Sequence, residues 1–76
     1  MGTVKYICEK VTRRQNNWLG HRLIITDNPM NAWVFDSEGE AIKAVEEFIR
    51  IDTSGVKGFW IIQRVILQPK IYDTNV

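Results

Sequence analysis

The side chains of this sequence that can carry out chemistry are few, and they are not paired along the chain. Cys8 is the one cysteine and His21 the one histidine. A reactive thiolate needs a base nearby, and a structural zinc site needs four ligands, usually of the cysteine and histidine types. Cys8 lies between Ile7 and Glu9, where a free cysteine acts as a small apolar residue. We therefore expect an inert, buried Cys8, an exposed His21, and neither a metal nor a cofactor.

The acidic side chains also give little indication of catalysis. Glu38, Glu40, Glu46 and Glu47 form the densest acidic group, and paired carboxylates can serve acid–base chemistry. Here, however, they fall on the polar side of an amphipathic segment, where Glu38 and Glu40 suit the positive end of a helix. The chain also carries no phosphate-binding or dinucleotide-binding glycine motif. These observations predict a protein that is not an enzyme.

The stretch 13–18 has the strongest binding character. It combines two arginines, three amides and an indole. Arginine pairs with phosphates or carboxylates, amides read base edges, and tryptophan stacks on bases or anchors an interface. We expect this stretch at a hairpin tip, where it binds protein, binds nucleic acid, or simply folds Trp18 back over the sheet. The candidate partner-binding residues are Arg13, Arg14, Trp18, Arg22, Glu46 and Glu47.

Charge is unevenly distributed along the chain. The net charge is +1. Residues 1–26 carry five basic and one acidic side chain, residues 27–52 carry two basic and seven acidic, and residues 53–76 carry three basic and one acidic. Such segregation steers association with charged partners and does not determine the fold.

One helix is clearly encoded at residues 38–51. Ser37 and Glu40 have the spacing of a capping box, which satisfies free amides at a helix start. Apolar residues then recur at helical spacing, at Ala41, Ile42, Val45, Phe48 and Ile49.

The remaining chain is typical of strands and turns. The predicted strands are 3–13, 22–26, 32–35 and 59–67, separated by a loop at 14–20, a turn at 27–31 and, after the helix, a turn at 52–58. Pro69 marks an edge, a bulge or the end of the last strand, and residues 71–72 add further pairing. Short connections favour an antiparallel meander, and the helix must cover one face of the sheet. We predict a single α+β domain over residues 1–76, with a four-stranded, mostly antiparallel sheet of β-β-β-α-β order and the helix on one face.

The last strand is apolar on both faces. Phe59, Ile61, Val65 and Leu67 share one face, and Trp60, Ile62 and Ile66 share the other. We expect the helix, through Ala41, Val45, Phe48 and Ile49, to pack on Phe35, Ile61 and Val65. The patch of Trp60, Ile62 and Ile66 would then lie outside and form a symmetric homodimer, unless Tyr72 and the C-terminal tail cover Trp60.

Compartment follows from cysteine usage and hydropathy. A lone cysteine cannot form an intramolecular disulfide, which favours a reducing, intracellular setting. The apolar runs are too short to span a bilayer, and no signal peptide is visible. We expect a cytoplasmic protein.

The layout resembles that of small proteins encoded by phages and prophages, including several anti-CRISPR families. The resemblance rests on a first strand at Val4–Ile7, the Ala-x-x-Phe segment Ala32–Phe35, and the helix opening Ser37–Ala41. It implies a single α+β domain that binds and inhibits or modulates a host protein stoichiometrically, as an anti-defence protein does. The acidic face of the helix adds the expectation that it imitates nucleic-acid phosphates toward a basic partner. The alternative is a nucleic-acid-binding module that uses the basic N-terminal hairpin, with Lys5 and Lys10 on phosphates.

Overall fold

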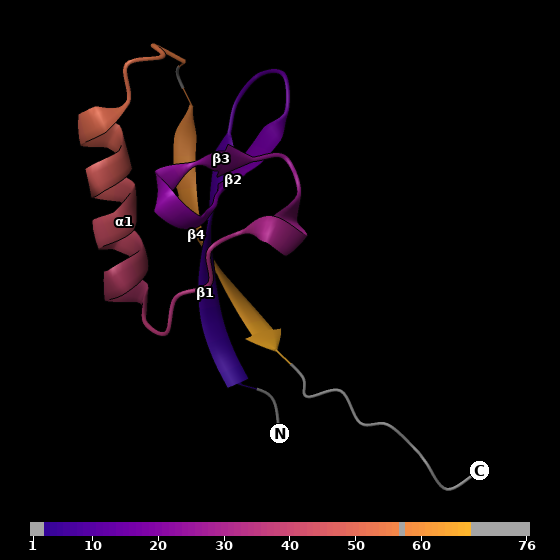
Figure 1. Ribbon diagram of the computed structural model, residues 1–76. Helices are drawn as coiled ribbons and strands as arrows, with labels where there is room; N and C mark the ends of the chain where they lie inside the picture. The colour runs from indigo at the N-terminus through magenta and orange to yellow at the C-terminus, as the bar shows by residue number, and fades with distance from the viewer. Residues whose placement is uncertain (1–2, 57, 68–76) are drawn as a thin grey trace, which may run out of the picture.

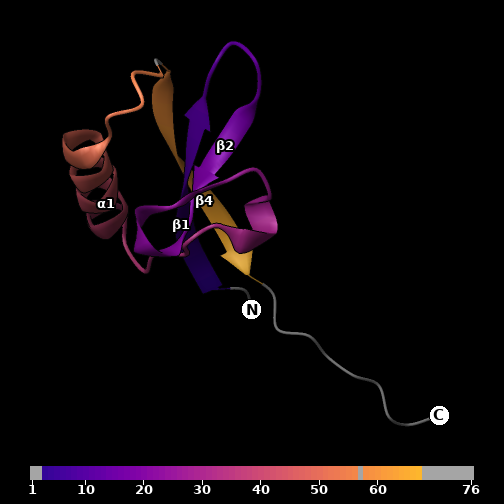
Figure 2. The same ribbon diagram turned by 45° about the horizontal axis from the view of Figure 1, so that its top comes forward.

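The computed structural model describes residues 3–56 and 58–67, which build one sheet and one α-helix (Figure 1). Along the chain the elements are β1 (Thr3–Val11), β2 (Asn16–Leu19), η1 (His21–Leu23), β3 (Ile25–Thr26), η2 (Pro29–Asn31), α1 (Glu38–Ile51) and β4 (Phe59–Leu67). The four described strands pair antiparallel in the order β3-β2-β1-β4. Helix α1 stands on one side of this sheet in both views (Figures 1 and 2). The predicted α+β fold is confirmed, whereas Pro69 and the pairing expected at 71–72 lie outside the described residues.

The first hairpin turns earlier than the sequence predicted. Thr12 closes a short turn, because its backbone N–H and its hydroxyl both donate to the Gln15 carbonyl, at 3.3 and 2.7 Å. Strand β1 therefore ends at Val11, and the expected loop 14–20 contains strand β2. Trp18 consequently lies within the sheet, opposite Glu9, and not at a hairpin tip.

The second predicted strand, 22–26, is interrupted at its start. Arg22 and Leu23 adopt left-handed backbone conformations, with φ of 61° and 60°, and only Ile25–Thr26 pair as β3. Gly20 permits this tight reversal, since its N–H donates to the Ile24 carbonyl at 2.7 Å and an added Cβ would lie 2.8 Å from the same oxygen.

The third predicted strand, 32–35, is present only as two isolated bridges, Gly20 with Ala32 and Tyr6 with Phe35. Tyr6 and Phe35 exchange both backbone hydrogen bonds, at 2.9 and 2.8 Å. The segment thus runs beside the first half of β1, where β2 no longer covers that edge, and it leads directly into helix α1.

Helix α1 has the predicted bounds. The Ser37 hydroxyl accepts from the Glu40 N–H at 3.2 Å, which is the expected N-cap. At the other end the Asp52 N–H donates to the Phe48 carbonyl at 2.8 Å. The helix buries Ala41, Ala44, Val45 and Phe48 against the sheet.

The core lies between α1 and the sheet, and it uses the other face of β4 from the one predicted. Trp60 and Ile62 pack against the core, and the Trp60 ring meets the Phe48 ring edge-on at 5.5 Å. Ile61 and Ile49, both expected in the core, are 41% and 58% exposed. The buried core consists of Cys8, Leu19, Phe35, Ala41, Ala44, Val45 and Phe48.

The pairing register explains this error. Residues directly opposite in an antiparallel pair share a face, and the register sets Cys8 opposite Ile62 and Lys10 opposite Trp60. The even-numbered residues of β1 and β4 therefore face the helix. The predicted outer patch of Trp60, Ile62 and Ile66 is wrong as an outer face, because it lies on the helix side of the sheet.

Candidate interaction site

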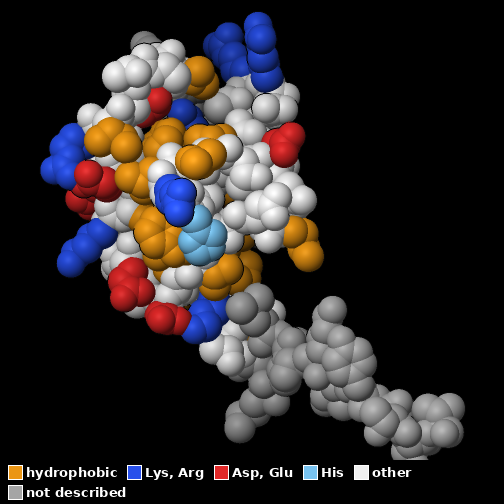
Figure 3. Space-filling view, in the orientation of Figure 1, with side chains coloured by type: hydrophobic (Ala, Val, Ile, Leu, Met, Phe, Trp, Pro, Cys, Tyr) orange, Lys and Arg blue, Asp and Glu red, His pale blue; other side chains and the backbone are white. Residues whose placement is uncertain are grey.

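The candidate site is an open groove of about 650 Å³ between helix α1 and the segment that precedes it. Its floor is apolar and its rim carries both signs of charge. Hydrophobic side chains gather at the centre of this face of the molecule, with both acidic and basic side chains along its helix side (Figure 3). The lining residues are Leu23, Trp33, Val34, Phe35 and Ala44, with Arg22, Asp36, Glu40, Lys43 and Glu47 around them.

A row of aromatic rings leads from the core to this groove. Phe35 is buried, and its ring centroid lies 4.6 Å from that of the half-buried Trp33. Trp33 in turn lies 5.5 Å from the exposed ring of His21. Trp33 and Phe35 line the groove and give it an aromatic floor that can contact apolar or aromatic groups of a ligand.

Ion pairs within the chain neutralise part of the charge at the rim of the groove. Asp36 forms an ion pair with Lys5, and Glu47 pairs with Arg50 on the same helix. Among the described residues Arg22, Lys43 and Glu40 make no ion pair. These three side chains are available to a bound partner.

Backbone strain is concentrated at one wall of the groove. Arg22 and Leu23 both line it, and both hold left-handed conformations. Such a conformation costs a non-glycine residue roughly 1–2 kcal/mol, and strained residues cluster at binding and active sites. The strain is consistent with a segment that is shaped for binding.

The structure brings together only two of the predicted partner-binding residues. Arg22 and Glu47 line the same groove, from η1 and α1. Glu46 is exposed on the helix beside it. Trp33 and Lys43 also line the groove and were not predicted as site residues. The i,i+4 spacing of Lys43 and Glu47, which sets both on one side of a helix, is the signal that points to Lys43.

The remaining candidates lie elsewhere. Arg13 and Arg14 are exposed in the β1–β2 turn. Trp18 is half-buried on the sheet face that points away from α1, opposite Glu9 and Thr26. Its indole Nε1 is buried and has no hydrogen-bond partner among the described residues. Of the alternatives left open for this stretch, the structure agrees with the one in which Trp18 lies over the sheet and both arginines are exposed.

Groups suited to chemistry are held in unreactive settings. Cys8 is buried as predicted, its Sγ donates to the Ala41 carbonyl at 3.5 Å, and burial raises the pKa of the thiol to about 11. At neutral pH it is therefore a neutral thiol.

Within residues 3–56 and 58–67 no three side chains of histidine, cysteine, aspartate or glutamate come together as a metal site. No helix in that part of the chain is long and apolar enough to cross a bilayer.

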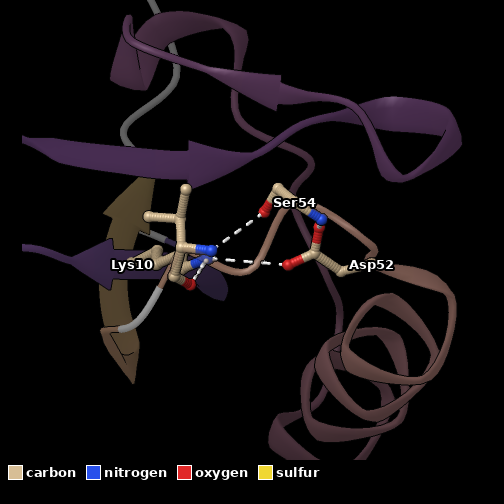
Figure 4. A network of polar contacts seen from close by, with 4 residues as sticks. Lys10, Asp52 and Ser54 are labelled. Carbon is tan, nitrogen blue, oxygen red and sulfur yellow. Dashed lines mark hydrogen bonds and ion pairs between the residues drawn. The ribbon is translucent and has the colours of Figure 1, made fainter.

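The most deeply buried charge among the described residues belongs to Lys10, which is 7% exposed. Figure 4 shows Lys10 beside Asp52 and Ser54. Its Nζ donates to the Val56 carbonyl at 3.1 Å, lies 3.9 Å from Asp52 Oδ2, and is 5.7 Å from the centre of the Phe48 ring. Hydrogen bonds from Ser54 and then the charge of Lys10 hold the pKa of Asp52 below its usual value. This network ties the turn after α1 to the sheet.

The comparisons with known proteins provide no family assignment. No protein-family model, no curated protein and no solved structure matches the chain significantly. The resemblance to small phage-encoded proteins is thus still a prediction from layout, and functional inference depends on the groove and the surfaces around it.

Proposed function

We propose that this protein is a non-enzymatic interaction protein that acts by stoichiometric binding of a protein partner in the groove beside α1. The observation that carries the proposal is the groove itself, with an apolar aromatic floor and charged side chains of both signs at the rim. Protein interfaces use this arrangement, in which a central apolar anchor is surrounded by polar contacts.

The rim indicates the chemistry of the partner. Glu40 and Lys43 line the helix side of the groove and make no ion pair among the described residues, so a segment with an apolar anchor flanked by one basic and one acidic residue is complementary to that side. Arg22 on the opposite wall suits a carboxylate of the same segment. The resemblance to phage-encoded proteins adds the expectation that the partner is a host protein that is inhibited or modulated on binding.

The alternative, a nucleic-acid-binding module, is favoured by the exposed Arg13 and Arg14 in the β1–β2 turn. The two lysines that were expected on phosphates weaken it. Lys5 is paired with Asp36, and Lys10 is buried beside Asp52. The basic surface is therefore smaller than the sequence predicted.

The test is affinity capture from host lysate with two charge-reversal variants. Lys43→Glu alters the groove rim, whereas Arg14→Glu alters the hairpin turn and is the matched control. We expect Arg14→Glu to retain the partner and Lys43→Glu to lose it, and calorimetry with the purified partner to give a fixed stoichiometry. Partner binding that survives Lys43→Glu but is lost with Arg14→Glu would contradict the groove as the site.

A gel-shift titration with nucleic acid distinguishes the nucleic-acid-binding alternative from the protein-binding proposal. A nucleic-acid binder loses affinity steeply with salt, with a slope of about 0.9 per phosphate contacted on duplex DNA. Salt-sensitive binding that is abolished in an Arg13→Ala, Arg14→Ala double variant would replace the protein-binding proposal.

A further inference from the structure

Strand β4 lies at the edge of the sheet that residues 3–56 and 58–67 form, and its outer backbone groups are unpaired within that part of the chain. Among the described residues it pairs only with β1. Its nine residues, Phe59–Leu67, contain no proline and one charged side chain, Arg64. Natural sheets usually protect such an edge with charges, proline, bulges or a covering segment. A long apolar edge with no proline and a single charge is a template for another strand.

The backbone groups that face this edge can be identified. The N–H and C=O of Tyr6 both bond to Phe35, on the side of β1 away from β4. Tyr6 is therefore in a non-hydrogen-bonded pair with Arg64, its partner in the register. It follows that the N–H and C=O of Arg64 point outward, and the two-residue period of a strand gives the same direction to Trp60, Ile62 and Ile66.

The sequence of β4 is complementary to itself in the antiparallel direction. If two copies pair about a two-fold axis at Gln63, all nine residues of β4 overlap. The outward backbone N–H and C=O groups of one copy then lie opposite those of the other copy. In that register Ile61 lies opposite Val65 of the second copy, and Trp60 lies opposite Ile66 of the second copy. Apolar cross-strand pairs of this kind stabilise a sheet.

The helix also presents apolar side chains towards this edge. Ile49 shares a pocket with Trp60 at the β4 side of α1 and is 58% exposed. Ile42, seven residues earlier and 40% exposed, lies on the same flank. Helix α1 packs across β1 and β4, and neighbouring strands are spaced about 4.8 Å apart. The two-fold axis lies midway between the two β4 strands, so each helix lies about one strand spacing from the axis. The two helices are then about 10 Å apart, close to the usual packing distance.

We propose that two copies of this chain pair through β4 and form a continuous eight-stranded antiparallel sheet with both helices on the same face. The interface consists of the backbone of β4, the pairs around Gln63, and the exposed flank of α1. It differs from the dimer predicted from sequence, which used the face of β4 that the helix covers. It is also separate from the groove, which lies on the other flank of α1.

A cysteine placed on the axis tests the register. At the central non-hydrogen-bonded pair the Cα atoms lie about 4.5 Å apart, within the range for a disulfide. Under mild oxidation Gln63→Cys should give a covalent dimer, whereas the matched control Ile61→Cys, offset along the strand from its own copy, should not. The native Cys8 is buried and does not compete. No covalent dimer with Gln63→Cys, or equal amounts with both variants, would overturn the proposed register.

Light scattering coupled to gel filtration tests the association itself. The unmodified chain should be dimeric at submillimolar concentration. Arg64→Pro removes an outward N–H and leaves the hydrogen bonds to β1 in place, because edge strands tolerate proline at such positions. This variant should stay folded by circular dichroism and become monomeric. A monomeric unmodified chain, or a folded Arg64→Pro variant that remains a dimer, would overturn the proposed interface.

Discussion

Replacement of Phe48 by alanine tests the packing that defines the fold. Phe48 is 8% exposed, its ring meets Trp60 edge-on at 5.5 Å, and Lys10 Nζ lies over it at 5.7 Å. The side chain thus connects α1, β4 and the buried lysine of β1. Its removal leaves a cavity and deprives Lys10 of part of its apolar cover, so the cost exceeds that of losing a surface phenylalanine.

The magnitude follows from measured substitutions of this type. Phe→Ala in a core costs about 3–5 kcal/mol, whereas a 76-residue domain has a stability of roughly 4–11 kcal/mol. Each kcal/mol lowers the melting temperature of a domain of this size by about 4–8 °C, so Phe48→Ala should melt about 12–40 °C lower or fail to fold. Phe48→Leu, which keeps most of the volume, should cost roughly 1–1.5 kcal/mol and keeps the test measurable.

Thermal melts followed by circular dichroism give the comparison. Met30 is 87% exposed on η2, and Met30→Ala is the matched control, with an expected change within about 0.5 kcal/mol. If Phe48→Ala melts within about 5 °C of the unmodified chain, or no lower than Met30→Ala, the packing of α1 on the even-numbered face of β4 is refuted.

Three further predictions concern single positions. The folded state lowers the pKa of Asp52, so its contribution to stability is complete above about pH 4 and is lost as the pH falls below that value; acid titration should show the stability difference between the chain and Asp52→Asn shrinking on acidification. Ser37→Ala should lower stability by about 1 kcal/mol and Ser37→Thr by less, as measured by urea unfolding. Arg22→Gly relieves a left-handed backbone conformation and should raise the free energy of unfolding by up to about 1 kcal/mol, which urea unfolding would show as a higher midpoint. A lower midpoint would contradict the strain.

Helix α1 and strand β4 could be predicted to the residue because their signals are local. Ser37 marks the helix start, and buried positions at helical spacing continue to Phe48. Strand β4 is a run of nine residues, seven of them apolar, that follows a glycine. In both elements each residue's neighbours in sequence carry the information that determines its conformation.

The face of β4 could not be predicted, because both of its faces are apolar and strand β1 decides between them. The polarity of β1 is misleading, since Lys10 belongs to the buried face. Lysine is almost never fully buried unless it is paired. Here the Lys10 stem is covered by Phe48 and Trp60 while Nζ reaches the Val56 carbonyl and Asp52. These partners are 38 to 50 positions away, so the pattern of β1 alone cannot reveal them.

The candidate site was only partly visible for a similar reason. Left-handed conformations at Arg22 and Leu23 have no sequence signature, because neither residue prefers that region. They depend on the backbone contact between Gly20 and Ile24 and on the segment that follows. The groove forms only when η1 meets α1, which joins Arg22 to Lys43 and Glu47 across more than twenty positions of the chain.

The two proposed surfaces lie on opposite flanks of one helix, and this has a consequence for binding. Glu40, Lys43 and Glu47 face the groove, whereas Ile42 and Ile49 lie on the β4 side. A dimer through β4 would therefore leave both grooves open on the same face of the continuous sheet. A partner with two suitably spaced segments would engage both, and a linked second contact can strengthen binding by 10²–10⁴-fold without new interactions. Arg64→Pro would then weaken binding to such a bivalent partner while its affinity for a single isolated segment stays the same, a difference that a groove defect such as Lys43→Glu would not produce.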